Sequence, residues 1–172
     1  MTQHGFKEIS ASNWLEQDPV LKGFVRFDPN LGSVQLSGDD WAAAFLEPSL
    51  DPVVPDEIQG LFEVARGAMI YGNFFYPLFT LGAEQLYRVA EAAVKQKCAQ
   101  MGEVSLRSFY SRINWLHEES VILSSDVPRW HAVRKLRNYA SHPNWQQIMA
   151  PGNALGKLET LSDLINHIFE GA

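Results

Sequence analysis

The chain has 172 residues, of which 46% are hydrophobic and 20% are charged. This composition is typical of a globular protein and excludes intrinsic disorder, and the length favours one domain with a self-sufficient core. The net charge of −6 excludes a general affinity for nucleic acid, so any contact with a polyanion requires a local basic patch.

Residues 1–54 are predicted to form an irregular arm, because prolines and glycines interrupt them repeatedly. Two β-like runs, residues 23–27 and 33–37, flank the turn sequence 28–32, which favours a small β-hairpin. Asp39 or Asp40 could cap a short helix that Pro48 stops.

From Pro55 onward the periodicity is helical, with loops predicted over residues 118–127 and 144–152. The first helix is predicted to begin at the N-cap Asp56 and to end at Gly72, with an inward face of Ile58, Leu61, Phe62, Ala65 and Met69. The longest helix is predicted over Phe74–Gln100, with Leu81 among its inward residues. Its outward charges form the i,i+4 pairs Glu84–Arg88 and Glu91–Lys95.

Three more helices complete the pattern. Ser105 is predicted to cap a helix through Leu116, and Pro128 suits the first turn of a helix that ends near Ser141. The last helix has an apolar face from Leu155 to Phe169. The sequence therefore predicts an all-α protein, an antiparallel up-and-down bundle of about five helices behind an N-terminal arm.

The helix before Pro143 concentrates basic residues in an otherwise acidic chain. Four of the chain's 14 Lys and Arg residues fall within positions 129–137. On a helical wheel, the predicted packing face consists of Ala132, Val133, Leu136 and Ala140. The predicted opposite face consists of Trp130, Arg134, Arg137, Asn138 and Ser141, with Lys135 further round. This interpretation places a cationic stripe with one aromatic residue before His142.

Arginine and histidine together can act on a phosphodiester. A guanidinium is a permanent bidentate donor for phosphate oxygens, and a histidine exchanges protons near neutral pH. In RNA the 2′-OH is an internal nucleophile, so cleavage needs a base, an acid and cationic stabilisation but no metal. One histidine cannot easily serve as both acid and base, whereas two chains meeting at this helix could supply two.

The run from Arg137 through Asn138 to His142 resembles the signature of the HEPN superfamily, an Arg followed after a short spacer by a His. The residue after that Arg is commonly polar, which Asn138 fits. The segment 83–91 is similar to the second helix of the family, and the resemblance, to its uncharacterised prokaryotic branch, covers residues 55–172.

The resemblance implies a homodimeric helical bundle that acts as a metal-independent endoribonuclease, with a toxin or defence role. By this analogy Arg137 binds the scissile phosphate, His142 is the general acid or base, and Asn138 orients substrate or histidine. We expect Trp130, Arg134, Lys135 and Ser141 to contact the RNA. The family also implies an antitoxin or nucleotidyltransferase as a partner protein.

A second interpretation of the same residues involves no catalysis. HEPN-like proteins include modules that bind a partner protein or a nucleotide without cleaving it, and the acidic net charge favours that role. In this alternative Arg137 is buried or paired with an acid such as Glu63, Glu84 or Glu91. His142 would then only cap a helix end, and Trp130 would pack in the core.

The sequence also lacks several motifs and segments that would indicate a cofactor, a metal site or a membrane. The sequence has no glycine-rich phosphate loop and no HExxH motif, so we expect no cofactor and no metal. The first ten residues have no apolar segment typical of a signal peptide, and no stretch is apolar enough for a membrane span, so we expect a cytoplasmic protein. Cys98 is expected to be a small buried residue.

Overall fold

The computed structural model describes residues 5–141 and 148–170, and most of them are helical. The elements are a 3-10 helix Pro19–Gly23, the strands β1 Val25–Asp28 and β2 Gly32–Gln35, and the helices α1 Gly38–Leu46, α2 Asp56–Tyr71, α3 Leu78–Gln100, α4 Phe109–Glu118, α5 Val127–Ala140 and α6 Pro151–Phe169. The predicted all-α bundle with an N-terminal arm and a hairpin is confirmed.

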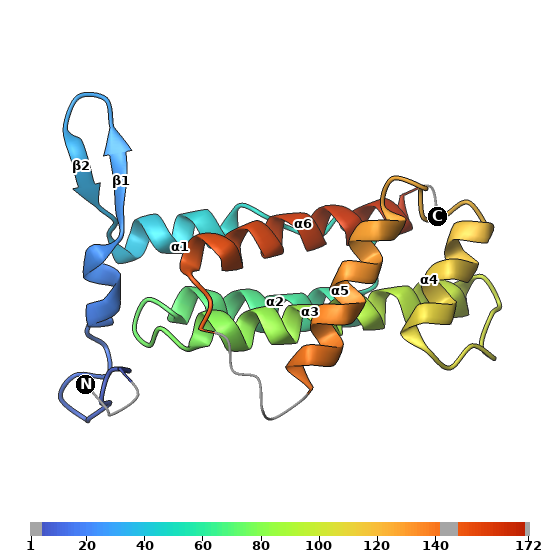
Figure 1. Ribbon diagram of the computed structural model, residues 1–172, viewed down its shortest axis with the longest axis horizontal. Helices are drawn as coiled ribbons and strands as arrows, with labels where there is room; N and C mark the ends of the chain where they lie inside the picture. Colours follow the sequence, from blue (N-terminus) through green and yellow to red (C-terminus); the bar gives the residue numbers. More distant parts are fainter. Residues whose placement is uncertain (1–4, 142–147, 171–172) are drawn as a thin grey trace.

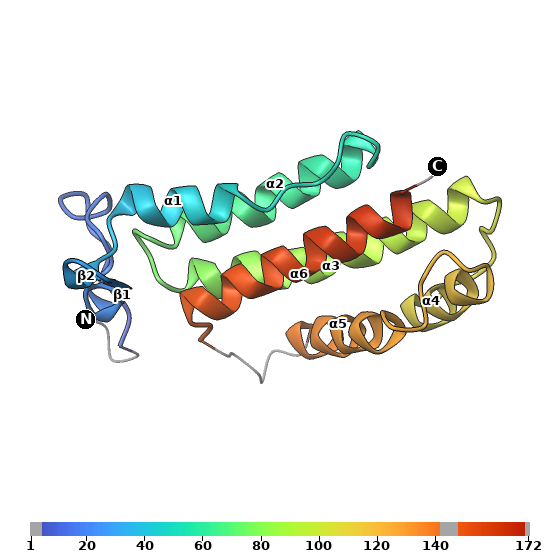
Figure 2. The same ribbon diagram turned by 90° about the horizontal axis from the view of Figure 1, so that it is seen from above.

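The long helix α3 is the centre of the molecule. It contacts α2, α4, α5 and α6. Seen from above, α1 and α2 form one side, α3 and α6 the middle, and α4 and α5 the other side (Figure 2). Because α3 contacts four helices, its buried face is wide and includes Phe79, Leu86, Val89, Ala90 and Val94.

Glycine permits the closest helix contact, between α2 and α3. A Cβ atom added to Gly82 of α3 would lie 2.5 Å from Cγ of Met69 and 2.8 Å from the carbonyl oxygen of Ala65, both in α2. Only a residue without a side chain fits there. The backbone of α3 at Gly82 therefore lies directly against the side chain of Met69 and the carbonyl oxygen of Ala65 in α2.

The arm is fastened to the bundle through a buried carboxylate. Asp18 is fully buried, and its carboxylate accepts hydrogen bonds from the backbone N–H groups of Val20, at 3.0 Å, and Tyr76, at 2.8 Å. Leu21, Trp41 and Phe45 belong to the same buried cluster as the later helices. The hairpin itself projects from the helical body (Figure 1).

Several local expectations need correction. Ser37, not Asp39 or Asp40, is the N-cap of α1, and Asp40 completes a capping box with it. Ser108, not Ser105, caps α4, and Pro77 immediately precedes α3, so that helix starts later than Phe74. Leu61 and Leu81 face solvent, with 37% and 54% of their surface exposed.

Within the described residues, the structure contains no helix with the length and hydropathy that a bilayer crossing requires.

Candidate functional site

Helix α5, which carries most of the predicted site, packs against α3 and α4. Pro128 lies in its first turn, where a missing N–H group costs nothing, and the helix ends at the C-cap Ser141. Its buried residues are Trp130 and Val133. Near its start Trp130 contacts Phe109 of α4, and near its end Arg137 contacts Glu91 of α3.

Trp130 packs in the core and does not face a ligand. Only 1% of its surface is exposed, and its ring meets that of Phe109 edge to face at 6.5 Å. This corrects its assignment to the substrate-binding residues and supports the packing alternative. At 100° per residue, Trp130 and Arg137 lie only about 60° and 40° from Val133, so a helical wheel places both on the packing side.

Arg137 is bonded to an acidic residue of the central helix. Its Nε donates to Oε2 of Glu91 at 2.7 Å, and 36% and 26% of the two side chains are exposed. A charge-assisted bond of this length is among the stronger polar contacts in a protein. Glu91 therefore bridges α3 to α5 and does not form the predicted pair with Lys95. A phosphate approaching Arg137 would meet the carboxylate of Glu91.

Arg134 makes a different contact, because it lies about 100° around the helix from Val133. Its guanidinium lies 5.4 Å from the centre of the Tyr110 ring of α4, and its Nε is buried without a hydrogen-bond partner. The same ring stacks on His131 at 5.1 Å, and Nε2 of His131 lies 3.1 Å from Oδ1 of Asn114. These contacts tie α5 to α4.

Burial lowers the pKa of His131, and the nearby charges of Arg134 and Lys135 lower it further. A histidine with a lowered pKa is neutral at physiological pH. The sequence did not indicate this aromatic contact, because it depends on the packing of two separate helices.

The remaining predicted residues do not form one site. Lys135, Asn138 and Ser141 are exposed, and the hydroxyl of Ser141 donates to the backbone carbonyl of Arg137 at 3.1 Å. His142 lies outside the described residues. The joint presentation of Arg137 and His142 to one phosphate therefore stays a prediction.

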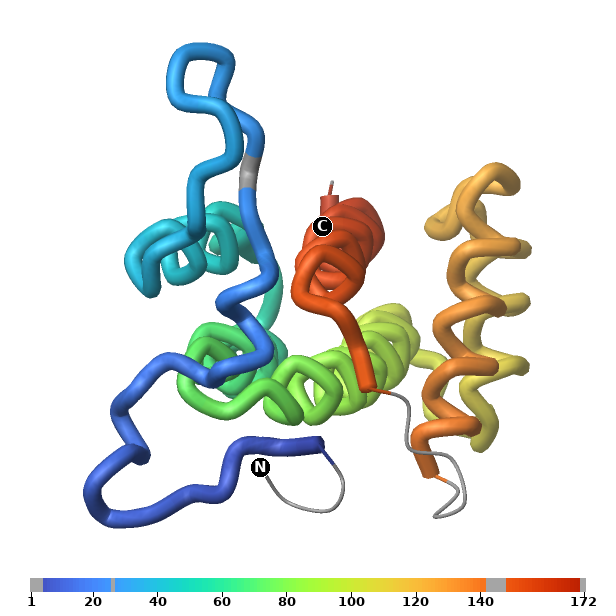
Figure 3. Tube along the Cα trace, turned by 60° about the vertical axis from the view of Figure 1, so that its left-hand side comes forward, coloured from blue at the N-terminus to red at the C-terminus, as the bar shows by residue number. Residues whose placement is uncertain are grey.

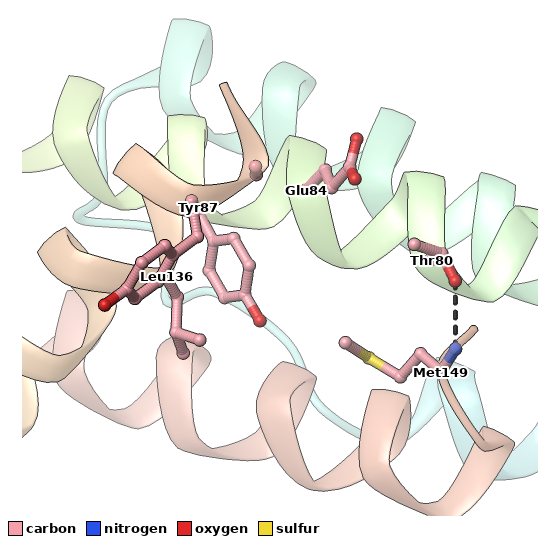
Figure 4. A pocket seen from close by; sticks show the side chains of 7 residues that line it. Thr80, Glu84, Tyr87, Leu136 and Met149 are labelled. Atoms are coloured by element: carbon pink, nitrogen blue, oxygen red, sulfur yellow. Dashed lines mark hydrogen bonds between the residues drawn. The ribbon is translucent and has the colours of Figure 1, made fainter. Parts of the chain in front are cut away.

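A cavity of about 370 Å³ opens beside the end of α5 (Figure 4). It is lined by Thr80, Glu84 and Tyr87 of α3, by Leu136, Tyr139 and Ala140 of α5, and by Met149. The backbone N–H of Met149 donates to Oγ1 of Thr80 at 3.0 Å. Burial, together with the nearby charge of Glu84, raises the pKa of Tyr87 to about 12. The phenol of Tyr87 is therefore neutral.

A second hollow of about 370 Å³, a groove between α5 and α6, lies next to this cavity. Tyr87 and Leu136 line both hollows. The tube trace shows α4 and α5 as a pair set apart from α6 (Figure 3). The walls of the groove between α5 and α6 carry Ala132 and Val133 of α5 and Gly152, Gly156 and Thr160 of α6. Arg129 and Lys157 are the cations that line it.

The sequence analysis missed the residues that define these hollows. Tyr87 lies on the buried face of α3, where a phenol usually needs a polar partner, and that was the one available signal. Within residues 5–141 and 148–170, no three His, Cys, Asp or Glu side chains are grouped so as to hold a metal ion. The groove and the cavity are both lined by residues of α5, the helix that carries the predicted site.

Comparison with known proteins identifies no relative. The chain matches no protein-family model, no curated protein and no solved structure. The resemblance to the HEPN superfamily therefore stays a prediction, and the proposals that follow depend on the geometry of the described residues.

Proposed function

We propose that this protein is a HEPN-like module that binds a partner protein and does not cleave RNA. The observation that carries the proposal is the 2.7 Å bond between Arg137 and Glu91. The guanidinium that would stabilise a phosphorane is already neutralised by a carboxylate. An approaching phosphate would have to displace Glu91 and would lose the charge-assisted bond.

The surroundings of Arg137 are also unfavourable for RNA. Glu84 lines the cavity beside the end of α5, and Glu91 already accepts the hydrogen bond of the Arg137 Nε. Trp130, which was the candidate for base stacking, is buried. Arg134 is engaged with Tyr110, which leaves Lys135 as the exposed cation of that stripe.

The groove between α5 and α6 favours a helix of a partner protein. A Cβ atom added to Gly152 or Gly156 would meet no atom within 4 Å, so the face of α6 towards the groove is open. An amphipathic helix lays its apolar side into such grooves, and small residues allow close approach. Lys157 has no acidic partner among the described residues, so it can pair with an acidic side chain of the incoming helix.

A cleavage assay separates the two functions. The purified chain, at micromolar concentration and in EDTA, is incubated with labelled single-stranded RNA beside the variants His142→Ala and His167→Ala. His167 is exposed on α6, outside the groove, and serves as the matched control. The proposal predicts the same absence of cleavage in all three proteins.

The endoribonuclease function predicts a different pattern. Cleavage by the wild type and by His167→Ala, lost in His142→Ala at an unchanged melting temperature, would contradict the binding function. It would also require that Arg137 leaves Glu91 when RNA binds. Cleavage that survives in His142→Ala and recurs in an independent preparation would also contradict the proposal, and it would show that His142 is not the catalytic group.

A further inference from the structure

Helix α2 has two apolar stripes, and the fold buries only one of them. The buried stripe consists of Ile58, Phe62, Ala65 and Met69. The other, which we call the outer stripe, lies about 110° further around the helix. It consists of Leu61, Val64, Ala68 and Tyr71. Val64 and Tyr71 leave 61% and 60% of their surface exposed, although both side chains are largely apolar.

The outer stripe has the spacing by which helices pack against one another. Its four positions are separated by three, four and three residues, which is the a/d alternation of a coiled-coil seam. Gly67 lies beside it, and a Cβ atom added there would meet no atom within 4 Å. A glycine in an exposed helix weakens that helix, but it lets a second helix approach closely. The outer stripe is therefore a packing surface without a partner in the monomer.

The distribution of charge favours a second copy of this chain as that partner. The chain has a net charge of −6, so two copies repel each other unless they meet at an uncharged surface. Between Ile58 and Tyr71 the charged residues are Glu63 and Arg66, which pair with each other away from the outer stripe. A partner of another sequence is usually selected by charges beside the seam, and this seam offers none.

The outer stripe is also complementary to itself about a two-fold axis at residue 66. In an antiparallel pair of α2 helices centred there, Leu61 meets Tyr71 of the second copy, and Val64 meets Ala68 of the second copy. Each layer of contacts thus combines a larger with a smaller side chain. No layer places a charge against a charge.

The area of this surface is sufficient for a weak dimer. Helix α2 has 16 residues, so it is about 24 Å long and about 10 Å wide. Leu81 of α3 is exposed next to Gly82, the residue that touches α2, and it widens the surface. A strip two helices wide covers roughly 500 Å² on each copy, or about 1,000 Å² in total, which is near the lower limit for a specific interface.

We propose that two copies of this protein form an antiparallel dimer through the outer stripe of α2. Helices α2 and α5 lie on opposite sides of the molecule (Figure 2), so this dimer keeps the two Arg137 side chains apart. It differs from a dimer in which two chains meet at α5 and combine their histidines. The proposal does not depend on the binding of a partner protein, and its tests do not involve RNA.

Sedimentation equilibrium of the full chain, loaded at about 5 to 500 µM, tests the dimer. The wild type should dimerise with a Kd below about 200 µM. Val64→Glu should raise the Kd at least about tenfold, because it places two like charges near the two-fold axis. Val104→Glu is the matched control, because Val104 is 80% exposed in the loop before α4, and it should leave the Kd unchanged. Equal melting temperatures of the two variants at low concentration show that both fold.

Cross-linking tests the orientation of the two copies. A mixture of Val64→Cys and Ala68→Cys, treated with a short bismaleimide, should form a covalent dimer faster than either variant alone. A wild type that stays monomeric at about 500 µM, or an unchanged Kd in Val64→Glu, would overturn the proposal. Cross-linking of Val64→Cys alone as fast as the mixture would contradict the antiparallel arrangement.

Discussion

His131 lies between two cations of its own helix and the aromatic ring of Tyr110 on α4. One ring nitrogen faces Asn114 and the other, Nδ1, is buried with no hydrogen-bond partner. A second proton on this ring would bring a third positive charge next to Arg134 and Lys135. The folded protein therefore binds that proton less readily than the unfolded chain.

We predict that His131 makes the protein less stable in mild acid. As the pH falls through about 6.5, the unfolded state takes up the proton first, so the free energy of unfolding decreases until the pH is below the lowered pKa. Urea unfolding of the wild type and of His131→Gln at pH 7.5, 6.5 and 5.5 measures this. The stability of the wild type should fall more steeply with acid than that of the variant. Parallel pH profiles would contradict the prediction.

Individual site residues could be predicted from the sequence only in part. Arg137 was identified, and one of the carboxylates weighed as its partner, Glu91, does bind it. The sequence could not show whether Arg137 binds a phosphate or Glu91, because 46 positions separate Arg137 from Glu91 in the chain. The burial of Trp130, in contrast, is predictable from the sequence, because on a helical wheel this residue lies about 60° from Val133, on the packing side.

At the scale of elements, α2 and α3 form the tightest pair in the fold. Gly82 lies at their closest approach, whereas Gly60, on the exposed side of α2, would carry a side chain without meeting any atom within 4 Å. The two glycines therefore differ in what they contribute. One allows the packing, and the other only weakens its helix.

We predict opposite effects for alanine at these two positions. Gly82→Ala should destabilise the protein by about 1–3 kcal/mol, because the new methyl group overlaps with Met69 and with the backbone of Ala65. Gly60→Ala should stabilise it by about 0.5–1 kcal/mol, because alanine favours the helix. Chemical denaturation followed by circular dichroism measures both. A neutral or stabilising Gly82→Ala would show that the two helices do not approach so closely.

The helices themselves could be predicted well, and their partners could not. Periodicity marked each helix, and breakers such as Gly72 and Pro128 marked where several of them begin or end. An apolar stripe shows which face of a helix is buried, but not which neighbour buries it. The pairing of α5 with α4, and its separation from α6, therefore followed only from the structure.

The groove between α5 and α6 is a property of the whole molecule, since α3 provides a residue of its lining, Tyr87, and the other two helices provide its walls. We predict that it binds amphipathic helical peptides that carry an acidic residue. In a selection from a library of helical peptides, the wild type should enrich such sequences. Gly156→Leu should reduce their affinity by tenfold or more, because leucine fills the groove.

Gly60→Leu is the matched control, because this glycine faces open space on the other side of the molecule. Peptides that bind Gly156→Leu as well as they bind the wild type would contradict a helix in the groove. Lys157→Glu provides a second readout, because it should shift the preference away from acidic peptides. Enrichment of peptides without acidic residues would place the contact elsewhere.

On our proposal, the Arg137 guanidinium stays bonded to Glu91 and does not bind RNA. The most direct measurement is the Nε–H signal of Arg137 in an arginine-selective ¹H–¹⁵N spectrum, assigned with Arg137→Lys, during titration with a 2′-O-methyl RNA oligonucleotide that cannot be cleaved. The signal should exchange slowly with water, move in Glu91→Gln, and stay unchanged in the wild type when RNA is added. A shift of the wild-type signal that saturates with RNA would contradict the account and favour the endoribonuclease.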